Sequence, residues 1–81
     1  MKITVKFFAA HRKAAGRSQV DLEMPPSSTV QDLLDALVER YPHLEDRLPF
    51  TTVSVNHRQA HPDRALREGD QVSLFPPIGG G

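Results

Sequence analysis

Histidines and carboxylates are the side chains that most readily do chemistry, and this sequence contains four histidines and ten acidic residues. His57 and His61 lie four positions apart, a spacing that brings two metal ligands together only on a helix. Pro62 and the turn-forming residues around these histidines argue against a helix there. We therefore interpret the histidines as polar loop residues and predict no metal site.

Two pairs of carboxylates could serve as an acid and a base, namely Asp32 with Asp35 and Glu45 with Asp46. Such a pair works only where a pocket separates the two pKa values, and nothing in the sequence supplies that pocket. We interpret both pairs as solvated. The sequence also lacks a Gly-x-Ser-x-Gly motif, a Walker glycine loop and a dinucleotide fingerprint, and it has no cysteine to act as a nucleophile.

The remaining candidate is the C-terminal segment FPPIGGG, residues 75–81. Its two prolines favour an extended chain, and at about 3.1–3.4 Å per residue the tail reaches roughly 20 Å beyond the sheet. Glycines without side chains could thread a narrow channel in another protein, where the terminal carboxylate is the one reactive group. That carboxylate needs activation by a separate ATP-using enzyme. The alternative is a frayed end without a function.

Alternating apolar and polar residues indicate the strands that must support this tail. In residues 2–8, Ile3, Val5 and Phe7 share one side of the chain, which is typical of a half-buried strand. The same alternation occurs in residues 19–24, 51–56 and 71–75. Residues 56–62 predict a turn with a short edge segment.

Helical patterns separate these strands. Residues 9–15 stop at Gly16 and predict a short helical turn. Ser28 followed by Gln31 is a capping-box pattern, so we expect Ser28 to be the N-cap of the main helix, which Pro42 ends. Apolar residues recur at helical spacing between them. After Pro42 we expect a polar connector with at most one helical turn.

This order of elements predicts an α+β protein of the β-grasp, or ubiquitin-like, type. A mixed sheet of four to five strands would be covered on one face by one main helix. We expect the β-grasp domain to comprise residues 1–75, and residues 76–81 to be a flexible tail that carries the reactive glycine.

Two phenylalanines fall on otherwise polar strand faces. Phe8 belongs to the first strand and Phe75 to the last, and β-grasp topology makes these strands neighbours. Their rings would then form an exposed apolar patch, which often marks a partner site. The alternative is that each ring caps a sheet end over its own chain.

Charge and hydropathy exclude two kinds of partner. Ten basic residues balance ten acidic ones without a basic run, so we do not expect nucleic acid to bind. No stretch approaches the roughly 20 apolar residues that span a bilayer, so we expect no membrane segment and a cytoplasmic protein.

Several stretches together resemble the MoaD family, the sulfur-carrier subunits of molybdopterin synthase within the MoaD/ThiS group of ubiquitin-like proteins. The resemblance covers nearly the whole chain, and its most specific part is GD-x-V-x-L-F-P-P running into terminal glycines. The matching stretches are KFFAAHRKAAG, TVQDLLDALVERYP, VSVN and LREGDQVSLFPPIGGG.

The resemblance implies a protein that is not an enzyme alone and binds no cofactor. A MoeB-like, E1-type adenylyltransferase would adenylate the C-terminal glycine with ATP, and a sulfur donor system would convert it to a thiocarboxylate. The sulfur would pass to a MoaE-like large subunit, within a heterotetramer, to form the dithiolene of molybdopterin.

The resemblance also implies the site residues. The family usually ends in two glycines and this chain in three, so we expect Gly81 to react, with Gly80 as the alternative terminus. Arg12 matches the FFA-x-x-R pattern and is a candidate for a polar contact with the large subunit. The residues expected to bind a partner are Phe8, Arg12, Phe75, Pro76, Pro77, Ile78 and Gly79.

Two other functions stay open. A ThiS-like or related carrier would use the same chemistry to deliver sulfur for thiazole, cysteine or tRNA thiolation. A ubiquitin-like modifier joined to lysines, or a β-grasp binding module, would release no sulfur product.

Overall fold

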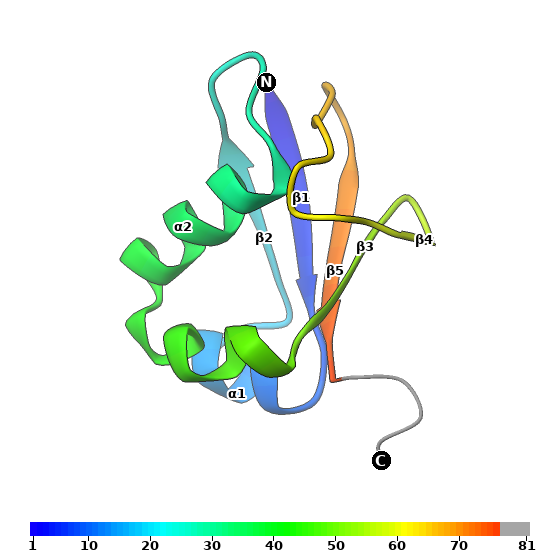
Figure 1. Cartoon of the computed structure of the whole chain (residues 1–81). Helices are drawn as coiled ribbons and strands as arrows, with labels where there is room; N and C mark the ends of the chain where they lie inside the picture. Colours follow the sequence, from blue (N-terminus) through cyan, green and yellow to red (C-terminus); the bar gives the residue numbers. More distant parts are fainter. Residues whose placement is uncertain (77–81) are drawn as a thin grey trace.

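The computed structural model of the chain describes residues 1–76; the predictions for Pro77 and for residues 78–81 lie outside this part. Five strands form one mixed sheet in the order β2-β1-β5-β3-β4 (Figure 1). β1 and β5 pair in parallel at the centre, and the other neighbours are antiparallel. The strands are β1 (Lys2–Phe7), β2 (Gln19–Glu23), β3 (Thr52–Val55), β4 (Arg58–Gln59) and β5 (Gln71–Phe75).

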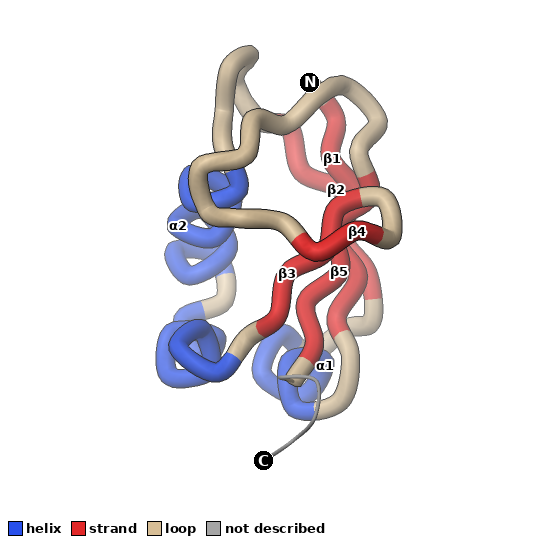
Figure 2. Tube along the Cα trace, turned by 45° about the vertical axis from the view of Figure 1, so that its right-hand side comes forward, coloured by secondary structure: helices blue, strands red, loops and turns tan. Residues whose placement is uncertain are grey.

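The helices lie on one side of this sheet and leave the other side bare (Figures 1 and 2). α2 (Val30–Arg40) is the main helix, followed by the 3₁₀ helix η1 (Pro42–Phe50), and α1 (Ala10–Ala15) lies near the end of β1. This arrangement confirms the predicted α+β fold with a mixed sheet and one main helix.

The core lies between the sheet and the helices, as the alternation predicts. Ile3, Val5 and Phe7 of β1 are at most 2% exposed, and Leu33 and Leu37 of α2 are completely buried. Each such side chain contributes about 1.5–3 kcal/mol by leaving water. The ring of Tyr41 meets that of Phe7 edge-on, with centroids 6.0 Å apart. Since α2 ends just before Tyr41, this contact fastens the end of the helix to the sheet.

The start of α2 corrects one prediction. Thr29 and not Ser28 is the N-cap: its hydroxyl accepts a hydrogen bond from the Asp32 amide at 3.2 Å, and the Asp32 carboxylate accepts one from the Thr29 amide at 2.9 Å. Ser28 is buried, and its hydroxyl donates to the Pro25 carbonyl at 2.7 Å. Serine and threonine both suit the cap position, so the turn that begins at Pro25 decides which of them is used.

The connector after Pro42 is also more ordered than predicted. It forms a nine-residue 3₁₀ helix instead of at most one turn. The reason is Leu44, which is completely buried and fixes this segment to the core although most of its neighbours are exposed.

Candidate functional site

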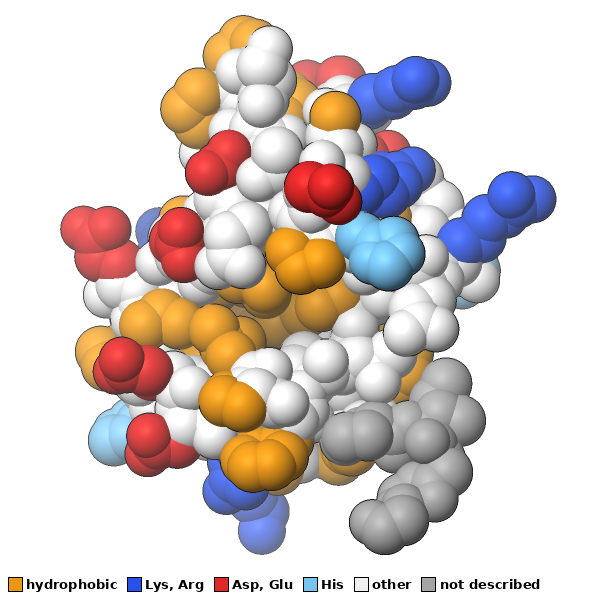
Figure 3. Space-filling model, viewed as in Figure 1, with side chains coloured by type: hydrophobic (Ala, Val, Ile, Leu, Met, Phe, Trp, Pro, Cys, Tyr) orange, Lys and Arg blue, Asp and Glu red, His pale blue; other side chains and the backbone are white. Residues whose placement is uncertain are grey.

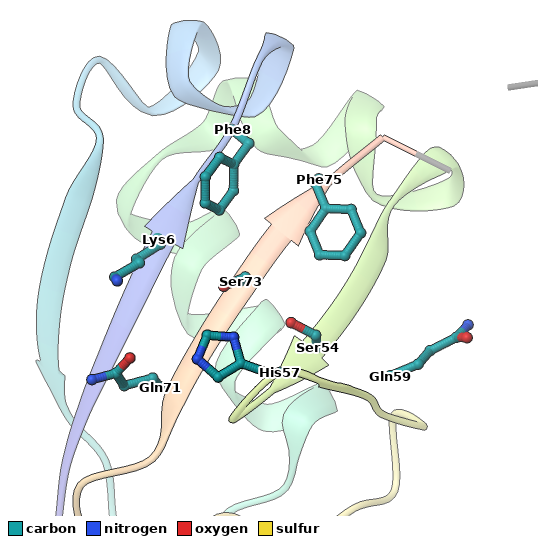
Figure 4. Close-up of a pocket in the computed structure, with 8 residues that line it drawn as sticks. All are labelled: Lys6, Phe8, Ser54, His57, Gln59, Gln71, Ser73 and Phe75. Atoms are coloured by element: carbon teal, nitrogen blue, oxygen red, sulfur yellow. The ribbon is translucent and has the colours of Figure 1, made fainter. Parts of the chain in front are cut away.

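The bare face of the sheet carries a groove of about 550 Å³. Eight residues line it, from β1 and the position directly after it, β5, β3, β4 and the β3–β4 turn, and all are labelled in Figure 4. Phe8 and Phe75 lie at one end, His57 lies at the other, and Ser54 and Ser73 lie between them (Figure 4). The opposite, helix-covered side of the molecule is shown partly in Figure 3, where apolar side chains line a hollow near α2.

The two aromatic rings form one exposed patch. Their centroids are 6.3 Å apart and their planes meet at 82°, an edge-to-face contact worth about 0.5–1.5 kcal/mol. Phe8 is 47% exposed, and Phe75 is half-buried. The contact follows from the pairing of β1 with β5, so the predicted patch is confirmed and separate capping of two sheet ends is excluded. The use of this patch by a partner stays a prediction.

A strained turn holds Phe8 in this position. Phe8 follows β1 directly, its amide donates to the Leu74 carbonyl at 3.1 Å, and its own carbonyl accepts from the His11 amide at 3.0 Å. Between them Ala9 has φ 51° and ψ −126°, a conformation that glycine adopts readily and alanine does not. Sequence reasoning missed this turn, because no local signal marks an alanine for positive φ.

His11 lies within the helical turn predicted over residues 9–15, but its burial corrects the interpretation of the histidines as polar loop residues. It lies in α1 and is 2% exposed, with Nε2 2.6 Å from the Thr51 hydroxyl. That hydroxyl donates to the Arg47 carbonyl, so it accepts from His11, and Nε2 carries the imidazole proton. Nδ1 is buried without a partner among the described residues. Burial lowers the pKa of His11; the Phe8 carbonyl opposes this shift and the charge of Arg47 adds to it.

A buried carboxylate supports the other end of the groove. Asp70 accepts hydrogen bonds from Asn56 Nδ2 at 2.9 Å and from the Arg67 amide at 2.8 Å, and Arg64 lies 3.5 Å away. Burial alone would raise the pKa of Asp70, but these donors and the Arg64 charge lower it. Asn56 and His57 both have positive φ, as tight hairpin turns require, so Asp70 fixes the turn that presents His57. Sequence reasoning predicted the turn at residues 56–62 but not its support by Asp70; Asn56, within that turn, was the available signal.

The other predicted partner residues are not gathered at the groove. Arg12 is exposed on α1 and does not line it, and Pro76 is exposed directly after Phe75. The structure therefore brings Phe8 and Phe75 together, but it does not bring Arg12 to them.

The carboxylates considered as acid and base have structural or solvated positions. Asp32 is the N3 residue of the capping box of α2, Asp35 accepts from Gln31 Nε2 at 2.9 Å, and Glu45 and Asp46 are exposed. Within residues 1–76, no group of three or more His, Asp or Glu side chains is placed to hold a metal ion. No helix in this part of the chain has the length and apolarity needed to cross a membrane.

A sequence model of the ThiS family matches residues 5–81 of this chain. The chain belongs to the ThiS family.

Two relatives of this ThiS-family chain carry different names. It is 32% identical to the molybdopterin synthase sulfur carrier subunit of Arabidopsis thaliana, over 100% of this chain and 84% of that protein. It is 35% identical to small archaeal modifier protein 3 of Haloferax volcanii, over the full length of both.

Solved structures share the ubiquitin-like β-grasp fold. The crystal structure of SAMP1 from Haloferax volcanii superposes with a TM-score of 0.90 at 34% identity, covering 100% of each chain. A chain from the complex of subunits 1 and 2 of the molybdopterin-converting factor of Helicobacter pylori has a TM-score of 0.71 at 22% identity, covering 100% of each chain, which shows the fold alone.

Proposed function

We propose that this ThiS-family chain is the sulfur-carrier subunit of a molybdopterin synthase and that its partner is a MoaE-like large subunit. The observation that carries the proposal is the exposed Phe8–Phe75 pair, with ring centroids 6.3 Å apart, at the point where the glycine-ended tail leaves the sheet. A partner that covers the rings is thereby positioned to receive the tail. The name of the Arabidopsis relative supports this choice of partner.

The chemistry takes place at the terminal carboxylate. A carboxylate oxygen attacks the α-phosphorus of ATP in a MoeB-like enzyme, and pyrophosphate leaves. A persulfide of the sulfur donor then attacks the acyl carbon of the adenylate, and AMP leaves. A thiol attacks the donor-side sulfur of the resulting acyl disulfide, which releases the thiocarboxylate and leaves the thiol and the donor joined as a disulfide. The large subunit uses this sulfur for the dithiolene of molybdopterin. The chain supplies the carried sulfur and the docking face, and the active site belongs to its partners.

In this proposal the reactive carboxylate is that of the last glycine of the tail. With the chain used to its end, Gly81 carries the thiocarboxylate and the preceding glycines, Gly79 and Gly80, occupy the partner's channel. Deleting Gly81 alone tests this register: transfer that continues from Gly80 would make the third glycine dispensable.

Intact-mass measurement tests the proposal. After incubation with ATP, the activating enzyme and a sulfur source, we expect one C-terminal oxygen to be replaced by sulfur. We expect the loaded protein to support molybdopterin formation with a MoaE-like subunit. Deletion of Gly80 and Gly81 should abolish both results and leave thermal unfolding unchanged. An unchanged mass with active enzymes would overturn the proposal.

A modifier function is the second candidate, and the 35% identity to small archaeal modifier protein 3 favours it. In that case the activated glycine would be joined to lysine side chains. Isopeptide-linked conjugates in cell extracts, lost on deletion of Gly81, would support this function. Co-purification with a thiazole synthase instead of a MoaE-like subunit would favour a ThiS-like acceptor.

A further inference from the structure

Strand register arranges the bare sheet face in two rows of side chains. Lys6 of β1 is opposite Ser73 of β5, Ser73 is opposite Ser54 of β3, and Ser54 is opposite Gln59 of β4. These four side chains form a polar row across four strands. Two positions further along β1 and β5 lie Phe8 and Phe75, the aromatic row, at a distance of about 7 Å along the strands.

The polar row offers hydrogen-bond donors and no acid. None of the eight groove residues is Asp or Glu, whereas Ser54, Ser73, Lys6 and His57 all have groups that can donate. Figure 4 shows the two serines between the aromatic rings and His57. The row is therefore suited to a negatively charged group.

Lys6 is the charged member of this row. Its side chain is half-buried, and it makes no ion pair within residues 1–76. Lys2 on the same strand differs, because its Nζ lies 3.6 Å from Asp21. The acidic residues of the sheet are thus paired near one end of β1, and the groove at the other end retains an unpaired positive charge.

We propose that the polar row accepts a carboxylate of the partner protein, with Lys6 as its ion-pair partner, while the aromatic row contacts an apolar side chain about 7 Å from that carboxylate. A small inorganic anion would satisfy the donors and leave both rings exposed, whereas a protein surface covers both rows. This inference rests on the proposed function and adds the chemistry of the partner surface. Lys6 then selects partners, since a basic residue opposite it is repelled.

Binding to a MoaE-like large subunit, measured by calorimetry with the full chain, tests the role of Lys6. We expect Lys6→Glu to weaken binding by at least about tenfold, Lys6→Gln by less, and Lys6→Arg to stay near the wild type. The Kd of Lys6→Gln should depend less on salt concentration than that of the wild type. Lys2→Glu is the matched control: it makes the same charge change on the same strand outside the groove, and we expect an effect within about twofold.

The outcomes separate the inference from the proposed function. If the wild type binds and Lys6→Glu binds equally well, the inference is overturned and the proposed function stands. Equal weakening by Lys2→Glu and Lys6→Glu would indicate a general charge effect and also overturn the inference. Restoration of Lys6→Glu binding by a lysine in place of one partner carboxylate would support it. A wild type that binds no large subunit overturns the proposed function together with the inference.

Discussion

Phe7 and Phe8 are adjacent in the sequence and lie on opposite faces of the sheet. Phe7 is 2% exposed and meets Tyr41 in the core, whereas Phe8 is 47% exposed and meets Phe75 on the bare face. The two contacts have almost the same edge-to-face geometry, with centroids 6.0 Å and 6.3 Å apart. One pair lies in the core and stabilises the fold, and the other lies on the exposed face.

The difference extends along both central strands. Their inward residues are apolar and buried, and the strands keep Lys6 and Ser73 on the outward side. The inner face is constrained by packing against the helices, so its chemistry says little about function. The outer face has no such constraint within the described part of the chain, so its unpaired donors and rings are the more informative feature.

Truncation of Phe7 should have the largest effect on stability. We expect Phe7→Ala to lower the free energy of unfolding by about 3–5 kcal/mol, because it opens a cavity beside Tyr41. This is a large share of the roughly 5–15 kcal/mol that stabilises a small domain. Urea unfolding followed by circular dichroism measures the change, with Phe7→Leu as a milder control. A loss below about 1 kcal/mol would contradict the assignment of Phe7 to the core.

Acidification should have a smaller effect, through His11 on the helix side. The folded-state pKa of His11 lies below its ordinary value of 6.5, so the unfolded chain binds more protons between these two pKa values. Its contribution to stability is therefore complete above about pH 6.5 and is lost as the pH falls below it. Urea unfolding at about pH 7.5 and about pH 5.5 should show this decrease. His11→Gln should reduce the pH dependence of the free energy of unfolding. If that dependence is unchanged in the variant, other titratable groups cause it.

Relief of the backbone strain at Ala9 should raise the stability of the protein. We expect Ala9→Gly to raise the free energy of unfolding by about 0.5–1 kcal/mol, because glycine adopts φ 51° and ψ −126° without a steric cost. Thermal unfolding measures the gain, and Ala10→Gly within α1 serves as a control that should destabilise. A destabilised Ala9→Gly protein would contradict the strain.

Truncation of Phe8 should have the smallest effect on stability and a large effect on binding. We expect Phe8→Ala to cost about 0.5 kcal/mol, since an exposed ring pair contributes at the low end of the aromatic range. Binding to a MoaE-like subunit should weaken by at least about tenfold. Calorimetry and thermal unfolding of the same sample separate the two effects. If Phe8→Ala weakens binding only because the protein unfolds, then Phe8 stabilises the fold as Phe7 does and the predicted binding role is contradicted.

Much of this comparison could be predicted from the sequence. A period of two assigns alternate residues to opposite faces, so Val5 and Phe7 were correctly predicted to be buried and Phe8 to point outward. The contact of Phe8 with Phe75 required the topology as well, because it depends on β1 and β5 being neighbours. The aromatic half of the groove was therefore predictable.

The burial of His11 and the polar row could not be predicted, because both depend on contacts between distant parts of the chain. His11 is buried, and the acceptor of its hydrogen bond, Thr51, lies forty positions away. The polar row that starts at Lys6 exists because strands far apart in the sequence pair in one particular register. Local patterns do not encode such registers. The prediction of Ser28 as the N-cap failed for a different reason, because the adjacent Thr29 has the same capping chemistry.

The contact between Tyr41 and Phe7 makes the protein its own spectroscopic reporter. Tyr41 is the single tyrosine, and the chain has no tryptophan. Its phenol packs against the core on the helix side, with the sheet between it and the groove. Emission from this tyrosine therefore follows loss of the fold, and tryptophan emission from a complex would come from the partner.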